Sequence, residues 1–282
     1  MPKARKRKLP ITASSNIPTS TTSSKPESSR TIIRQFHVLL KQQAQLQRLL
    51  LSDPSKSAEL EDVERKIEEL GGLQSYQRMS AIGQGNDRGG GSEKVFIGWL
   101  RERSVHETAG DKLKLLEVGA LKPDNYSSCS TWIQNTPMDL NSRHSSILQQ
   151  DFLLLDQEQN KQRWDLISLS LVLNFVPEAV DRGLMLRLAH DFLVPEGYLF
   201  VALPLPCLLN SRYLDFEKLK ELIAFLGFEE IQQKWKKGGK MVYLLYQKPR
   251  MDRATEKRQV PAHLTRKVVI RQGNRNNFAI LL

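Results

Sequence analysis

The apolar run WDLISLSLVLNFV (164–176) constrains the fold of this chain more than any other feature. It is rich in Leu, Ile and Val and lacks a polar face, which is typical of a strand buried on both sides of a sheet. Such a strand needs a layer of helices on each side. The residues that follow it supply helical patterns at 178–192 and 213–226, and a further buried strand at 197–203.

Shorter strand patterns complete an alternation of strands and helices. They occupy 112–119, 136–140 and 145–152, and the stretch 228–248 alternates like a hairpin that turns at Gly238-Gly239. This order predicts an α/β fold with a Rossmann-like, mostly parallel sheet and one reversed strand near an edge.

Both ends of the chain are basic, whereas the middle is close to neutral. Residues 1–30 hold seven Lys or Arg against one acid, and residues 249–282 hold eight against two, within a net charge of +11. We expect a disordered basic tail at 1–30 and a second basic tail at 249–282, whose closing FAILL (278–282) is either a short apolar anchor or without a role. Between them we expect a helical extension with a Gly-rich loop at 31–110 and a sheet domain at 111–248. Two basic tails favour a nucleic-acid partner, although solubilising tails have the same composition.

The helical extension begins with two amphipathic patterns, at 31–51 and 57–70, separated by Asp53-Pro54. They predict a helical hairpin. Packing of this hairpin against the sheet domain is the interpretation we favour, and a docking arm for RNA or for a protein partner is the alternative.

Several classes of protein are disfavoured. No apolar run approaches the ~18 residues that a membrane span needs, and no apolar stretch follows the basic start as it would in a secretory signal. The two cysteines, Cys129 and Cys207, and the five scattered histidines lack metal-ligand spacing. We therefore expect no membrane segment, no metal site and a reducing compartment.

The ends of the predicted strands carry the candidate cofactor residues. In open α/β sheets, ligands bind beyond the carboxyl ends of the strands. Gly119 and Asp139 end the first two strands and are twenty residues apart, which matches the offset between a nucleotide-cradling glycine and the acid that accepts from ribose hydroxyls. Asp151 ends the third segment, where it could accept from an adenine amino group while Phe152 covers the ring. For each acid alone, a helix cap or a surface position is the alternative.

The loop after Gly119 contains no further glycine, so a pyrophosphate has no close backbone approach. This favours a ligand without phosphates, such as S-adenosylmethionine. Asn174 and Phe175 follow the long apolar strand and are the candidate catalytic residues, since Asn174 could hold a base edge and Phe175 could stack on it. A turn-forming asparagine and a core phenylalanine are the alternatives.

Several runs resemble the fungal nucleolar 25S rRNA (adenine-N1)-methyltransferase family, a family of class I S-adenosylmethionine-dependent methyltransferases. They are GGLQSYQRMSAIGQGNDRGGGSEK (71–94), LLEVGALKPDNY (115–126), MDLNSRH (138–144), QQDF (149–152), DLISLSLVLNFVPEAVDRG (165–183) and PLPCLLNSRYLD (204–215).

The resemblance implies seven strands with the last one antiparallel, S-adenosylmethionine at Gly119 and Asp139, and an adenine of large-subunit rRNA or of a pre-ribosome as methyl acceptor. It also implies that the protein is located in the nucleus, within the nucleolus. Gly91 departs from the family pattern, which has an acid there. Animal relatives resemble a sensor that binds S-adenosylmethionine and docks on signalling complexes, so a sensor or adaptor without methyl transfer is the alternative function.

Overall fold

The computed structural model describes residues 35–72, except 37, 41, 44, 48 and 52, and residues 91–282, except 109, 143 and 251–258. The predicted basic tail at 1–30 and most of the Gly-rich loop, at 73–90, lie outside the described residues. None of the described helices is long and apolar enough to cross a bilayer.

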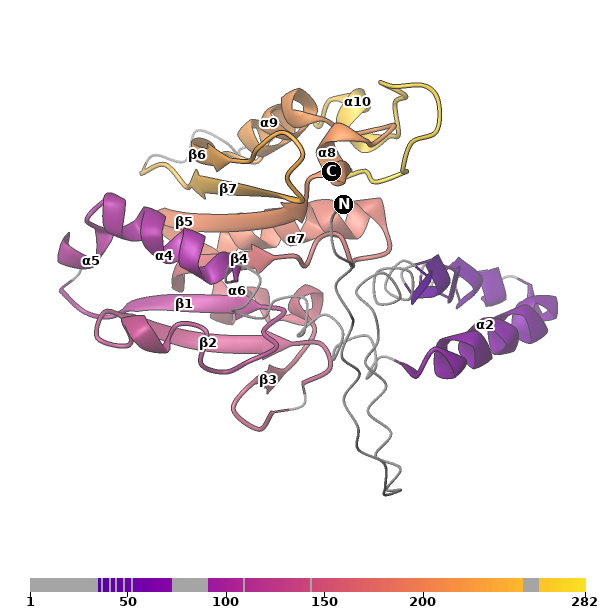
Figure 1. The fold of residues 1–282 in the computed structure, drawn as a ribbon, viewed down its shortest axis with the longest axis horizontal. Helices are drawn as coiled ribbons and strands as arrows, with labels where there is room; N and C mark the ends of the chain where they lie inside the picture. The colour runs from indigo at the N-terminus through magenta and orange to yellow at the C-terminus, as the bar shows by residue number, and fades with distance from the viewer. Residues whose placement is uncertain are drawn as a thin grey trace, which may run out of the picture.

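A seven-stranded sheet forms the centre of the molecule, in the order β3-β2-β1-β4-β5-β7-β6 (Figure 1). Every neighbouring pair is parallel except those of β7, which runs antiparallel to both β5 and β6. The strands are β1 Leu113–Val118, β2 Ile133–Asp139, β3 Leu148–Gln149, β4 Trp164–Ser170, β5 Leu193–Pro204, β6 Glu229–Lys234 and β7 Met241–Gln247. The predicted mostly parallel α/β sheet with a reversed strand near one edge is confirmed.

The sheet separates two apolar clusters, because successive side chains of a strand point to opposite faces. In β4, Leu166 contributes to one cluster and Ile167 to the other, so the prediction of burial on both faces is correct. One face is covered by α4 Ser92–Glu102, where Phe96 stacks on Phe200 of β5 with ring centroids 4.8 Å apart. The other face is covered by α7 Ala179–Phe192 and α9 Phe216–Phe225.

Apart from the two helices of the helical extension, the remaining described helices are short. They are α5 Val105–Thr108, α6 Gln157–Asn160, α8 Pro206–Leu209 and α10 Ala262–Thr265, with 3-10 turns η1 Pro54–Lys56, η3 Ser127–Cys129 and η4 Phe152–Leu154.

The long strand is shorter than its sequence pattern predicts. β4 ends at Ser170, which pairs with Ala202, and the next residue, Leu171, adopts a left-handed φ of 58°. The backbone N–H of Phe175 then donates to the carbonyl of Val172 at 2.8 Å and closes a turn. Leu173 stays buried within this turn, so burial rather than strand pairing accounts for the apolar residues after Ser170.

The helical extension consists of α2 Ser57–Glu69 and a preceding helix that covers the described residues between 35 and 50. Phe36, Val63 and Ile67 are buried together between these helices, and Phe175 of the sheet domain packs against them. Asp53 caps η1 by accepting from the backbone N–H of Ser55 at 3.0 Å. The predicted hairpin is confirmed, and it contacts the sheet domain at the loop that follows β4.

The end of the chain is packed on the sheet domain, although its sequence predicts a basic tail from residue 249. Among residues 259–282, Leu264 and the four residues 278–281 are buried. The N–H of Leu281 donates to the carbonyl of Ala179 at 2.9 Å. A Cβ at Gly183 of α7 would lie 1.8 Å from the carbonyl oxygen of Leu281, so only glycine allows this approach. The segment therefore combines exposed basic residues with an apolar end, residues 278–281, that packs in the core.

Candidate functional site

The register of the sheet brings the predicted cofactor residues to one edge. The N–H groups of Gly119 and Ala120 both donate to the carbonyl of Met138, at 2.8 and 2.9 Å, and the N–H of Gln150 donates to the carbonyl of Asp139 at 3.1 Å. β4 pairs with β1 on the other side. The ends of β1, β2, β3 and β4 are therefore neighbours, and in Figure 1 the helical extension lies beyond this edge.

Two features of the backbone at Gly119 exclude a side chain at this position. Its φ is 77°, in the left-handed region, and a Cβ there would lie 2.8 Å from Cγ2 of Val172. The loop after β4 is thus packed directly against the glycine at the end of β1. A side chain at this position would displace that loop.

Asp139 is partly buried at the end of β2, and its Oδ1 accepts from the N–H of Asn141 at 2.8 Å. Burial raises the pKa of its carboxyl, and the Asn141 bond opposes that shift. A partly desolvated carboxylate gains more from an added pair of hydroxyl donors than an exposed one does.

Asp151 and Phe152 follow the third strand, two and three residues after its last residue, Gln149. Oδ1 of Asp151 accepts from the N–H of Leu153 at 2.9 Å, so this residue caps η4. Phe152 has 3% of its surface exposed, and its ring lies edge-on to Phe192 with centroids 5.7 Å apart. The ring of Phe152 is therefore a member of the core, and its cover over an adenine stays a prediction.

Asn174 and Phe175 lie on the loop between β4 and α7, four and five residues beyond the strand rather than within it. Asn174 has 8% of its surface exposed, and its Oδ1 is buried with no hydrogen-bond partner among the described residues. A buried acceptor in that condition costs roughly 1–3 kcal/mol until a donor reaches it. Phe175 packs on the cluster of Phe36, Val63 and Ile67.

Arg182 fixes the loop between β4 and α7 by hydrogen bonds to its backbone carbonyls. It is 2% exposed, and its guanidinium donates to the carbonyls of Val176, Pro177 and Ala279 at 2.9, 3.0 and 2.5 Å. It also lies 4.5 Å from the ring centroid of Phe278. Burial lowers its pKa to about 10, which leaves it charged at neutral pH. One side chain therefore joins the loop of Asn174 to the end of the chain.

A buried carboxyl, for which the sequence predicts no role of its own, lies two residues before Gly119. Glu117 is 7% exposed and accepts from Nδ2 of Asn125 at 2.6 Å and from Nδ2 of Asn135 at 2.7 Å. Burial raises its pKa to about 7, against the two hydrogen bonds. The available signal was a single acid inside the apolar strand KLKLLEV, but its asparagine partners are on other segments and cannot be assigned from spacing.

We expect Glu117→Gln to remove a pH dependence of stability. The folded wild type keeps the Glu117 proton up to a pKa of about 7, whereas an unfolded carboxyl releases it near 4.5. The folded state thus binds more protons in this window, and the free energy of unfolding should fall by roughly 3 kcal/mol as the pH rises through it. In the variant the buried Oδ1 of Asn135, which lacks a partner among the described residues, can accept from the introduced amide if the Asn135 side chain rotates.

Urea unfolding at about pH 5 and pH 8 measures this effect. The control is Glu229→Gln, which changes an exposed carboxyl on β6. Identical pH profiles for the wild type and Glu117→Gln would contradict the prediction.

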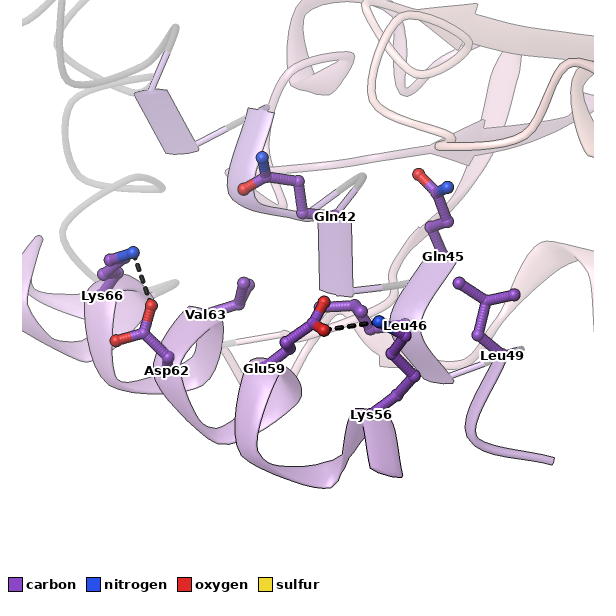
Figure 2. A pocket seen from close by; sticks show the side chains of 9 residues that line it. All are labelled: Gln42, Gln45, Leu46, Leu49, Lys56, Glu59, Asp62, Val63 and Lys66. Carbon is purple, nitrogen blue, oxygen red and sulfur yellow. Dashed lines mark hydrogen bonds and ion pairs between the residues drawn. The ribbon is translucent and has the colours of Figure 1, made fainter. Parts of the chain in front are cut away.

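One pocket of about 380 Å³ lies within the helical extension, away from the strand ends (Figure 2). Its walls carry two ion pairs, Lys56–Glu59 and Lys66–Asp62, each at 2.5 Å. None of the candidate cofactor or catalytic residues lines it. The described residues contain no group of side chains that could hold a metal ion.

The sheet order with β7 reversed, together with a glycine and an acid at the ends of its first two strands, defines a class I S-adenosylmethionine-dependent methyltransferase. A solved structure to which this chain is similar is the 1,6-didemethyltoxoflavin-N1-methyltransferase of Burkholderia thailandensis, at 14% identity and a TM-score of 0.41, covering 56% of this chain and 87% of that one. A likeness that low says nothing about the substrate.

The family model of the 25S rRNA (adenine(2142)-N(1))-methyltransferase, Bmt2, matches residues 61–280, and the chain belongs to this family. The Saccharomyces cerevisiae 25S rRNA (adenine(2142)-N(1))-methyltransferase is 33% identical over 255 residues, which cover 85% of this chain and 72% of that protein. The Schizosaccharomyces pombe 25S rRNA adenine-N(1) methyltransferase is 34% identical over 223 residues, covering 76% and 79%.

Proposed function

We propose that this protein transfers the methyl group of S-adenosylmethionine to N1 of an adenine in 25S rRNA, the adenine that corresponds to position 2142 named for the yeast relative. The observation that carries the proposal is the buried Oδ1 of Asn174, an acceptor without a partner among the described residues. It lies on the loop whose Val172 touches the site of Gly119. An acceptor next to the cofactor edge suits the exocyclic amino group of an adenine.

The cofactor would be held by residues of three strand ends. Gly119 allows the chain to turn beside the ligand, and the Asp139 carboxylate would accept from the two ribose hydroxyls. The Asp151 carboxylate would accept from the adenine amino group of the cofactor. Phe152 would contribute by fixing the position of Asp151 through its place in the core. When bound, S-adenosylmethionine supplies an electrophilic methyl group on a sulfonium.

The target adenine needs positioning more than proton transfer. Its N1 has a lone pair and attacks directly, so no general base is required, and catalysis depends on orientation and on accommodation of the cationic product. Asn174 would accept from the target's amino group, which directs the neighbouring N1. Phe175, held from one side by the Phe36 cluster, would stack on the base with its remaining surface. The adenine must be unpaired or flipped out, because pairing hides N1.

Nucleoside mass spectrometry of large-subunit rRNA, with and without this protein, tests the proposal. We expect 1-methyladenosine to be lost without the protein and restored by the wild type. Asn174→Leu should lower kcat roughly a hundredfold, since it removes one orienting hydrogen bond to the reacting base. Asn174→Asp keeps an acceptor of the same size and should retain more activity. An unchanged nucleoside profile would refute the enzyme and leave the sensor or adaptor without methyl transfer.

We also propose a nucleolar location, which the basic cluster at residues 3–8 supports.

A further inference from the structure

The turn between β6 and β7 is a basic surface with an aromatic ring at its centre. Lys234, Lys236, Lys237 and Lys240 are all exposed, and Trp235 among them has 40% of its surface exposed. No carboxylate of the described residues forms an ion pair with these four lysines. Four unpaired positive charges on seven consecutive residues attract a polyanion.

Trp235 is held in place rather than free. Its ring stacks on Phe216, the first residue of α9, with centroids 5.4 Å apart and an angle of 25° between the planes. The turn itself is closed by a hydrogen bond from the N–H of Gly239 to the carbonyl of Lys236 at 2.8 Å. A large aromatic ring fixed on one side and exposed on the other is a platform on which an unpaired base can stack.

The direction of β7 places this turn at the cofactor edge of the sheet. Because β7 is antiparallel to β5, its first residue, Met241, pairs with Pro204 at the carboxyl end of β5. The N–H of Leu205 also donates to the carbonyl of Lys240 at 2.8 Å. With neighbouring strands about 4.8 Å apart, the turn is roughly 10–15 Å along the edge from the end of β4, which precedes Asn174.

We propose that residues 234–240 are an RNA-docking site, at which the lysines bind the phosphates of unpaired nucleotides and Trp235 stacks on one of their bases. The proposal rests on the proposed function, because it names a site for the same rRNA substrate beside the target adenine. The chemistry recognised is a single strand rather than a duplex, since a stacked base must be unpaired to lie on the indole.

The test measures the Kd of a fluorescein-labelled single-stranded RNA of about 12 nucleotides for the wild type and for variants of the turn. Lys236→Ala/Lys237→Ala should raise Kd about tenfold and reduce the slope of log K against log salt by about 1.4, or about 0.7 for each lost phosphate contact. Trp235→Ala should raise Kd by about tenfold with little change in slope, because stacking releases no counterions. Of the four tryptophans only Trp235 is exposed, so RNA should quench wild-type fluorescence more than that of Trp235→Phe.

The matched control is Lys112→Ala/Lys114→Ala, which removes two exposed charges at the opposite, amino end of β1. It should bind RNA like the wild type. Equal Kd values and salt slopes for the two double variants would overturn the docking site, and so would an unchanged Kd in Trp235→Ala.

Calorimetry with S-adenosylmethionine and methylation of 25S rRNA separate this proposal from the proposed function. A wild type that binds the oligonucleotide through the turn but never methylates rRNA would refute the function and keep the docking site. A wild type that methylates, with a Lys236→Ala/Lys237→Ala variant of unchanged KM for rRNA, would refute the docking site alone.

Discussion

Gly119→Arg should abolish binding of S-adenosylmethionine while the chain remains folded. The left-handed φ of 77° costs a non-glycine residue roughly 1–2 kcal/mol. The first side-chain carbon would meet Cγ2 of Val172 at 2.8 Å, so the side chain must pass over the edge where the cofactor is proposed to lie. Its guanidinium would also repel the sulfonium. We expect Kd measured by calorimetry to rise at least about a hundredfold, or roughly 2.7 kcal/mol.

Gly273→Arg is the control for this variant. Gly273 has a φ of 91°, so it has the same left-handed backbone, but a Cβ there meets nothing within 4 Å. It should bind S-adenosylmethionine like the wild type. Circular dichroism checks that both variants are folded. If Gly119→Arg bound the cofactor as tightly as Gly273→Arg does, the cofactor could not lie against the end of β1.

Arg182→Met should lower the free energy of unfolding by about 3 kcal/mol. The methionine fills much of the space but leaves three carbonyl oxygens, those of Val176, Pro177 and Ala279, without the donor that now satisfies them. An unsatisfied buried acceptor costs about 1–3 kcal/mol, and water can reach the partly buried ones. Urea unfolding followed by circular dichroism measures the loss.

The same helix offers a control for this variant. Arg187 is exposed on α7, and Arg187→Met should change stability by less than about 0.5 kcal/mol. Arg182→Met should also lower the rate of methylation at a temperature where the variant remains folded, because the loop of Asn174 loses its anchor. Equal stability of the two variants would show that the carbonyls find other donors.

The order of strands and helices could be predicted from the sequence because strand burial and helix periodicity are local properties. Examples are the burial of β4 on both faces of the sheet and the turn at Gly238-Gly239. The end of β4 could not be predicted in this way, because the residues after Ser170 are as apolar as the strand itself. Their burial comes from a turn packed between Gly119 and the helical extension, and contacts of that range leave no mark in local spacing.

For the candidate site, the sequence predicts positions at strand ends but not the packing or the hydrogen bonds of the side chains. The positions of Gly119 and Asp139 follow from strand ends and a spacing of twenty residues. The packing of the Phe152 ring on Phe192 could not be predicted, because the two residues are distant in sequence. The hydrogen bonds of Glu117 and Arg182 could not be predicted, because their partners, Asn135 and Ala279, are distant in sequence. The assignments of the site residues to cofactor and base remain predictions that the variants above test.

The anchoring of the Asn174 loop by Arg182 has a consequence for the timing of synthesis. Its acceptor on Ala279 follows it by 97 residues. At roughly 5–20 residues per second, a ribosome exposes that acceptor about 5–20 s after the helix that holds Arg182. The loop that carries Asn174 therefore cannot be locked until residues 278–281 have been added.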